Sequence, residues 1–109
     1  MAPKFEIKKG KGGYRFNLKA PNGKIILTSE QYVSKSGAEN GIRSVKKNSK
    51  IKGQYEKHKA KNGQDYFVLK AGNGETIGRS ETYESSSGAK AGMASVQKNA
   101  SGAKIDDQT

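Results

Sequence analysis

An internal repeat is the feature that most constrains how this chain can fold. At an offset of 51 positions, residues 16–48 match residues 67–99 at 19 of 33 places. Solenoids and propellers, the usual products of such a period, need three or more units to bury a continuous core. A chain of 109 residues is long enough for one compact domain. Two copies therefore predict a single domain, residues 1–109, in which two similar units related by pseudo-two-fold symmetry complete one core.

Each copy has the residue pattern of three strands followed by a helix. Alternating apolar and polar residues predict strands in KFEIKKG, GYRFNLKA and KIILTSE, and again in QYEKHKA, DYFVLKA and ETIGRSE. A last strand, AKIDD, follows the second helix, and we expect SKIKG to form its equivalent after the first. We therefore predict an α+β fold of two tandem β-β-β-α-β repeats, about 4–52 and 53–107. They form a continuous antiparallel sheet with two helices packed on one face.

The Asn-Gly turns allow two registers between the second and third strands of each copy. A two-residue type I′ hairpin would set Leu18 opposite Leu27. A three-residue loop, with the glycine in the left-handed region, sets Leu18 opposite Ile26 instead. We favour the three-residue loop with its bulge, because it pairs residues that both copies share. In the second copy the same register pairs Leu69 with Ile77.

The helices are expected to begin near Ser36 and Ser87 and to stop at Asn48 and Asn99. Ser36 and Glu39 have the spacing of a capping box. A glycine recurs in the middle of each helix, where it destabilises a helix by about 1 kcal/mol relative to alanine. Its recurrence predicts close approach of a strand or of the partner helix. The positions that define the repeat structurally are Asn22, Gly23, Glu30, Tyr32 and Gly41, and Asn73, Gly74, Glu81, Tyr83 and Gly92.

The motif LKAxNGxxIxxSExYxSxSGAxxGxxSVxKN occurs twice and resembles the YegP-like family of small, uncharacterised bacterial proteins. The resemblance covers nearly the whole chain. It implies β-β-β-α-β units that form one sheet and exchange their C-terminal strands. It also implies that single-repeat members dimerise, whereas a tandem member carries both halves in one chain. We accordingly expect a monomer with internal pseudo-two-fold symmetry. The family has no established activity, so the resemblance predicts a fold and no function.

The charge of the chain is large and unequally divided. The formal net charge is +11, and residues 1–50 hold 12 Lys and Arg against 3 acids, whereas residues 51–109 hold 9 against 7. The absence of cysteine excludes disulfides and thiolate metal sites. The longest aliphatic run, at 25–27, is far shorter than the roughly 20 apolar residues that a membrane helix needs. We expect a soluble cytoplasmic protein that does not enter a membrane.

Basic residues of the first copy form the candidate nucleic-acid-binding site. They surround the first hairpin and the end of the first helix, and phosphate backbones favour such a field through counterion release. The hypothesis is non-specific binding of RNA or DNA, and no RNA-recognition, helix-turn-helix or KH signature is visible. The residues expected to contact phosphates are Lys8, Lys9, Lys11 and Arg15 in the hairpin, extended by Lys46, Lys47 and Lys50 after the helix.

Two other interpretations of the basic residues stay open. Cations near a helix C-terminus are favoured by the helix dipole, and lysine-rich faces keep small proteins soluble. The basic surface would then serve solubility only. In that case the chain is a protein-interaction or scaffold domain that adds a partner's strand to an exposed sheet edge. Under every interpretation we predict a non-enzymatic binding or stress-associated module.

The sequence contains weak enzyme-like signals, and we assign none of them to catalysis. Glu30 and Glu81 each follow a serine, as a general base near a hydroxyl would. Their presence in both copies favours a structural role at the strand-to-helix corner. His58 has no second histidine to complete a metal site and is predicted to face solvent. GKGG at 10–13 lacks the phosphate-loop pattern and is predicted to be a hairpin turn. We predict no catalytic residue, no metal and no cofactor.

Overall fold

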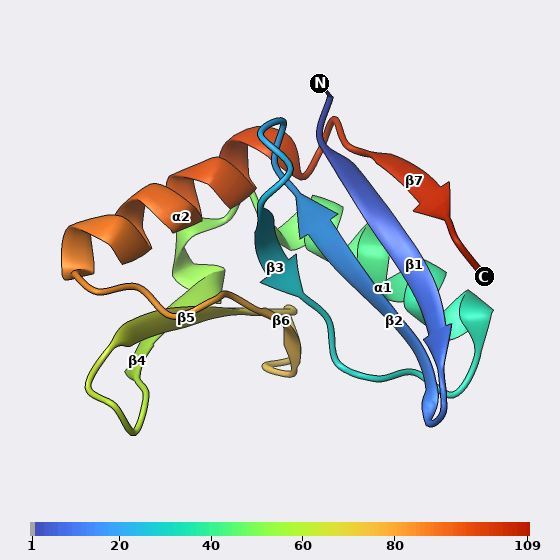
Figure 1. Ribbon diagram of the computed structural model, residues 1–109, viewed down its shortest axis with the longest axis horizontal. Coiled ribbons are helices and arrows are strands. Elements are labelled where there is room, and N and C mark those ends of the chain that lie inside the picture. Colours follow the sequence, from blue (N-terminus) through green and yellow to red (C-terminus); the bar gives the residue numbers. More distant parts are fainter. Residues whose placement is uncertain (1) are drawn as a thin grey trace.

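The computed structural model describes residues 2–109 and has one sheet and two long helices (Figure 1). The α+β class and the two-unit organisation are confirmed. The elements in chain order are β1 (Lys4–Gly10), β2 (Gly13–Lys19), β3 (Ile25–Thr28), α1 (Lys35–Asn48), a 3-10 turn (Lys52–Gln54), β4 (Tyr55–Lys59), β5 (Asp65–Lys70), β6 (Thr76–Arg79), α2 (Ser86–Asn99) and β7 (Lys104–Asp107). The strands lie in the order β4-β5-β6-β3-β2-β1-β7.

The sheet is continuous, as predicted, but it is mixed rather than antiparallel. Five neighbouring strand pairs are antiparallel, and at the centre Thr28 of β3 faces Arg79 of β6, which joins the two units. β7 instead runs parallel to β1, with Phe5 opposite Ile105. Figure 1 shows β7 beside β1, far from the strands that precede it in the chain. The last strand of the second unit therefore covers an edge of the first unit.

The predicted strand SKIKG after the first helix is wrong. Only residues 49–54 separate α1 from β4, and half of them form the 3-10 turn. A strand lying parallel to β4 would need a crossover of about a dozen residues before the chain could return as β4 itself. The linker is too short for that path. Among residues 2–109, β4 consequently has a strand partner, β5, on one side only.

The β2–β3 and β5–β6 turns have the predicted three-residue loop. The amide of Gly23 donates to the carbonyl oxygen of Ala20 at 2.9 Å, and Gly23 has a φ of +84°. Gly74 has a φ of +89°, the left-handed conformation that favours glycine. The side-chain oxygens of Asn22 and Asn73 each accept a hydrogen bond from the amide two residues later, at 3.0 Å. The Asn-Gly pairs are therefore turn residues.

The strand register that we predicted beyond this loop is wrong. A bulge at Ile26 shifts the pairing by one residue, so Leu18 lies opposite Leu27 and not opposite Ile26. The second unit has the same irregularity, which places Leu69 opposite Gly78. A bulge inserts an extra residue and interrupts the alternation of faces. Both Ile26 and Leu27 are consequently buried.

Each helix begins earlier than predicted and stops where predicted. The N-cap of α1 is Ser34, whose Oγ accepts a hydrogen bond from the amide of Gly37 at 3.0 Å, so the expected box starting at Ser36 is wrong. Ser85 caps α2 in the same way. Ser34 has the extended backbone that an N-cap requires, whereas Ser36 lies inside the helix. Neither helix is long and apolar enough to span a bilayer within the part of the chain that the structure describes. The two helices end at Asn48 and Asn99.

One cluster of buried side chains joins both helices to one face of the sheet. Phe5 packs edge-on against Phe16, with ring centroids 5.8 Å apart, and Tyr55 packs edge-on against Phe67 at the same distance. These pairs occupy equivalent places in the two units. The helices contribute Ile42, Val45 and Val96 to the same cluster.

The mid-helix glycines make room for a tyrosine ring of their own unit. Tyr32 stacks on Phe16 at 6.2 Å, and a Cβ on Gly41 would lie 2.8 Å from Cζ of Tyr32. The expected close approach of a strand is therefore confirmed, because the same Cβ would lie 3.0 Å from the ring of Phe16 in β2, but the tyrosine ring approaches still closer. Burial raises the pKa of Tyr32, and the nearby carboxylate of Glu30 adds to this effect. The second unit repeats the arrangement with Tyr83, Phe67 and Gly92.

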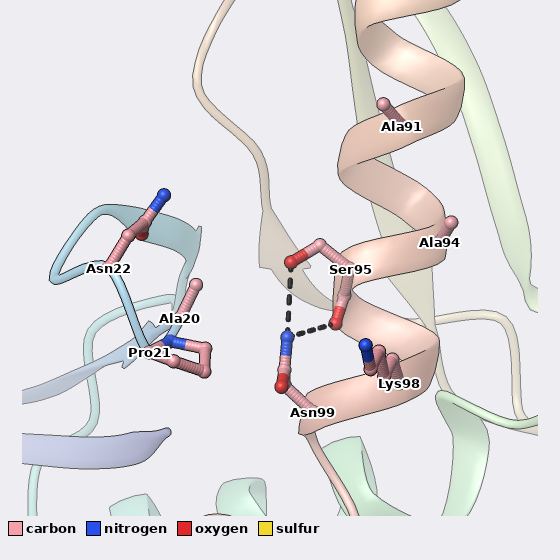
Figure 2. A pocket seen from close by; sticks show the side chains of 8 residues that line it. All are labelled: Ala20, Pro21, Asn22, Ala91, Ala94, Ser95, Lys98 and Asn99. Carbon is pink, nitrogen blue, oxygen red and sulfur yellow. Dashed lines mark hydrogen bonds between the residues drawn. The ribbon is translucent and has the colours of Figure 1, made fainter. Parts of the chain in front are cut away.

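Each helix also faces the Asn-Gly turn of the other unit. Figure 2 shows Ser95 and Asn99 of α2 facing the turn that carries Asn22, across a hollow. The side-chain Nδ2 of Asn99 donates to the carbonyl oxygen and the hydroxyl of Ser95, at 2.9 and 3.1 Å. An equivalent hollow separates α1 from residues 71–73. In the Figure 2 hollow, Ser95 and Asn99 bond within α2 and Asn22 bonds within its own turn, so we interpret the hollow as a seam between the units.

Ion pairs hold β7 in place. Lys4 lies 3.2 Å from Asp106, and Lys35, at the start of α1, pairs with Asp107. Hydrogen bonds from Lys35 and Thr109 lower the pKa of Asp107 from an ordinary 3.8 to about 2. Hydrogen bonds from Gln108 and Lys4 lower that of Asp106 as well.

We expect β7 to detach in acid before the rest of the sheet loosens. A carboxylate whose pKa is lowered by folding stabilises the fold above its ordinary pKa and loses that contribution as the pH falls. Amide signals of β7 should therefore change between about pH 4 and about pH 2, while those of β3 and β6 hold their positions. Two-dimensional NMR spectra of the wild type and of Asp107→Asn measure this. A variant with the same acid response as the wild type would contradict the assignment.

Candidate nucleic-acid interface

The four predicted hairpin cations lie together at the tip of β1 and β2. Lys8 is opposite Arg15, and Lys9 is opposite Tyr14. With Lys11 in the turn, the four cations line one shallow hollow. The Nζ of Lys9 lies 5.7 Å from the centre of the Tyr14 ring, on the helix side of the sheet. Lys8 and Arg15 therefore point to the other side, because neighbouring residues of a strand alternate between faces.

The face that carries Lys8 and Arg15 has no helix packed on it, and we call it the open face. The residues that face the core in β2 are Phe16 and Leu18, so Arg15 and Asn17 belong to the open face. Cross-strand pairing continues this face from β1 to β4, because directly opposed residues share a face. The row that runs across the sheet is Glu6, Asn17, Thr28, Arg79, Val68 and Glu56.

The charges on the open face are unevenly neutralised. Glu6, which is 4 % exposed, lies 3.1 Å from Lys19 and 3.4 Å from Lys4. Burial opposes ionisation of Glu6, but hydrogen bonds from the two lysines outweigh it and lower the pKa. Among residues 2–109, no carboxylate lies within 4.0 Å of the cationic groups of Lys8 and Arg15. Like charges directly opposite each other destabilise a strand pair.

The three predicted helix-end lysines do not join this hairpin group. The hairpin lies beside the segment that leads into α1, since the amide of Tyr14 donates to Tyr32 at 2.7 Å. Lys46 and Lys47 lie in the last turn of the helix, whose 14 residues span about 21 Å. Lys46 covers the ring of Phe5 at 5.9 Å, and Lys50 is exposed beyond the helix end. The expected continuous track of seven cations is therefore two separate groups.

A second aromatic and basic group, missed by the sequence analysis, lies on the same face. Tyr66 has Arg79 over its ring at 5.4 Å and His58 stacked on it at 5.4 Å. Tyr66, Arg79, Lys59 and Lys61 line a hollow at the tip of the second hairpin, equivalent to the hollow of the first. The signal was the sequence DYFVLKA, in which Tyr66 alternates out of phase with the core residues.

His58 is more constrained than a merely solvent-facing histidine. Its Nε2 lies 2.7 Å from Glu56, and its side chain is 39 % exposed. Lys70 also approaches Glu56, at 2.8 Å, and its hydrogen bond is the main cause of the lowered pKa of that carboxyl. No group of three potential metal ligands occurs in residues 2–109.

The serine–glutamate corners have structural roles. The Oγ of Ser29 accepts a hydrogen bond from the amide of Phe16 at 2.9 Å and donates to the carbonyl oxygen of Glu30 at 2.7 Å. Ser80 makes the equivalent bonds in the second unit. Glu30 and Glu81 are exposed at the surface. The hydroxyls are therefore engaged with the backbone, in agreement with the structural interpretation.

We expect Lys8→Glu to stabilise the fold. The substitution places opposite charges at a directly paired cross-strand site, and such a change contributes about 0.2–1 kcal/mol. Urea unfolding should show a higher free energy of unfolding than the wild type. Lys24→Glu, in the β2–β3 turn, makes the same change of net charge and serves as the control. An equal gain in both variants would mean that only net charge matters and that the Lys8–Arg15 pair is not strained.

Comparison with known proteins gives the family of the chain. The family model described as "Domain of unknown function (DUF1508)" matches residues 10–56 and again residues 60–107. The UPF0339 protein YegP of Yersinia pestis is 58% identical over 107 residues, which cover 96% of this chain and 95% of that protein.

Two solved structures are also similar. The solution NMR structure of yegP from E. coli, a protein of unknown function, has a TM-score of 0.93 at 46% identity, covering 100% of this chain and 95% of that one. The structure of a UPF0339 protein from Shewanella oneidensis has a TM-score of 0.91 at 45% identity, covering 98% of this chain and 92% of that one. The resemblance inferred from the repeated motif is confirmed: the chain belongs to the YegP-like (UPF0339) family and carries two tandem copies of its domain of unknown function.

Proposed function

We propose that this chain is a monomeric, non-enzymatic module that binds single-stranded RNA or DNA without sequence specificity through the open face. The observation that carries the proposal is the pairing of Lys8 with Arg15 on adjacent strands, where no carboxylate of residues 2–109 lies within 4.0 Å of either cation. A strand pair of this kind is destabilised until an anion neutralises it. Phosphate groups of a nucleic acid are such anions, and their binding releases counterions.

The aromatic group supports single-stranded rather than duplex ligands. Bases of a single strand stack on exposed aromatic rings, and arginine adds to that stacking. Tyr66 lies on the open face between Arg79 and His58, and its side chain is only partly buried, so a base that stacks on its ring takes the place of one of these two side chains. A single strand of nucleic acid that crosses the sheet from Arg15 would reach Tyr66 without leaving the open face. The non-enzymatic part of the proposal is supported by the engagement of Ser29 and Ser80 with the backbone.

Neutralising the hairpin cations tests the electrostatic part. We expect the triple variant Lys8→Gln, Lys11→Gln, Arg15→Gln to bind all sequences more weakly. The slope of log K against log salt should fall by about 2, since each single-strand phosphate contact contributes about 0.7. Fluorescence anisotropy with labelled single-stranded RNA, single-stranded DNA and duplex DNA across a salt series measures both quantities.

The matched control is Lys24→Gln, Lys98→Gln, Lys104→Gln, which removes the same charge from other surfaces. An equal loss of slope in both triple variants would reduce the interaction to net charge. If the wild type binds none of these nucleic acids near physiological salt, the basic residues only keep the surface solvated, and the proposal fails.

Replacing Tyr66 tests the stacking part. Tyr66→Leu keeps an apolar side chain but removes the aromatic face, and loss of one stacked base is worth about 1–3 kcal/mol. We expect affinity for single strands to fall by about fivefold or more, and affinity for duplex DNA to stay within about twofold. Anisotropy on both ligand types measures the difference. Equal affinities of the variant and the wild type for single strands would exclude Tyr66 from the interface.

A further inference from the structure

The two outer strands of the repeat units, β1 and β4, occupy equivalent places but have different neighbours. β1 is covered along its outer edge by β7, and the amide of Gln108 continues this pairing by donating to the carbonyl oxygen of Ile7 at 2.9 Å. β4 ends the sheet, and within residues 2–109 nothing pairs with its outer edge. The short linker after α1 imposes this difference, because it leaves no chain with which to cover β4.

Exposure differs accordingly at equivalent positions. Phe5 and Ile7 of β1 are 0 % exposed beneath α1 and beside β7. Their equivalents in β4, judged from the matching aromatic pairs, are Tyr55 and Lys57. Tyr55 is only partly buried and Lys57 is exposed. The uncovered edge therefore leaves unpaired backbone groups next to a partly exposed aromatic ring.

A hollow beside this edge is lined by apolar and basic side chains. The apolar part of the lining is formed by Tyr55 together with Met93 and Ala94 of α2. The basic part is formed by Lys52, Lys57 and Lys90, none of which has a carboxylate within 4.0 Å in the described chain. The apolar side chains would contact an apolar residue of a ligand, and the three lysines would attract carboxylates. The hollow therefore favours binding of an extended segment in which an apolar residue precedes carboxylates.

β7 shows what such a segment looks like on the equivalent edge. Its Ile105 lies opposite Phe5, and two residues later Asp107 lies opposite Ile7 and pairs with Lys35. Transferred to β4, the apolar residue lies opposite Tyr55 and the acid opposite Lys57. We propose that the free edge of β4 is an acceptor for one extended, acidic segment of a partner protein, added parallel to β4 as β7 is added to β1.

A second copy of this chain does not suit the edge. Two β4 strands pairing in the antiparallel sense would centre on Lys57, which would face its own copy. Directly opposed like charges destabilise such a pair. Lys57 and Lys90 instead complement carboxylates of a different protein. This inference is independent of the proposed binding of nucleic acid, which uses other residues.

A synthetic peptide of residues 103–109, AKIDDQT, is the probe, because it is the sequence that already covers the equivalent edge. We expect saturable shifts of the NMR signals of Tyr55–Lys59 and of Met93 in the labelled full chain. A peptide with both aspartates replaced by lysine should bind at least about fivefold more weakly.

Two variants and one control variant, all at Lys57, test the specificity of binding. Lys57→Glu should lower the affinity for the acidic peptide by about fivefold or more and raise the affinity for the lysine peptide. Lys57 is equivalent to Ile7, so its backbone amide points away from β5, toward the free edge. Lys57→Pro removes this amide and should prevent binding of the peptide, while the β1–β3 signals keep their positions. Lys57→Ala is its control for loss of charge and should retain more binding than the proline variant.

Several results would overturn the proposal. They are unchanged β4 signals at saturating peptide, shifts confined to β1 and β7, or equal binding of the two peptides. Concentration-dependent shifts of β4 without any peptide would assign the edge to a second copy. Shifts of β4 with a single-stranded oligonucleotide and none with the peptide would assign it to nucleic acid.

Discussion

The short link between the two units is the constraint on which the rest of the structure depends. Residues 49–54 connect α1 to β4 and cannot accommodate a parallel strand and its return. The second unit has no such restriction after α2, and its last strand crosses to β1. Two nearly equivalent units therefore make a sheet with one covered outer strand and one free outer strand. The core keeps its pseudo-symmetry despite this asymmetry, with the aromatic pairs Phe5–Phe16 and Tyr55–Phe67 both packed edge-on at a centroid distance of 5.8 Å.

The same pseudo-symmetry places different chemistry at equivalent corners of the open face. The first hairpin carries Lys8 and Arg15, and the second carries His58 and Tyr66, with Arg79 beside the tyrosine. In the proposed function the first corner would contact phosphates and the second would contact bases. On the helix side, Tyr32 and Tyr83 are packed under the helices, where burial raises the pKa of each. The aromatic rings on the helix side therefore belong to the core or pack against it, whereas Tyr66 remains at the surface of the open face.

The repeat, the strand pattern and the Asn-Gly turns were sufficient to predict the two units, the single core and the loop conformation, because these depend on local chemistry and periodicity. The details that depended on tertiary packing were not predictable. The bulge at Ile26 is favoured by burial of two adjacent apolar residues, and Ser34 caps the helix in place of Ser36 because of its backbone conformation. The strand expected at SKIKG failed because of chain length, which a residue pattern does not encode. Tyr66 was visible as an out-of-phase residue, but only the register places Arg79 next to it.

The most direct test of the binding surface is a map of the amides that respond to a short single-stranded oligonucleotide. The ligand is added to the isotope-labelled full chain, and two-dimensional NMR spectra are recorded at low and at physiological salt. We predict shifts at Lys8, Arg15, Tyr66 and Arg79, on strands far apart in sequence but on one face of the sheet, and weaker shifts at higher salt. Shifts confined to the end of α1, or spectra unchanged at low salt, would contradict it.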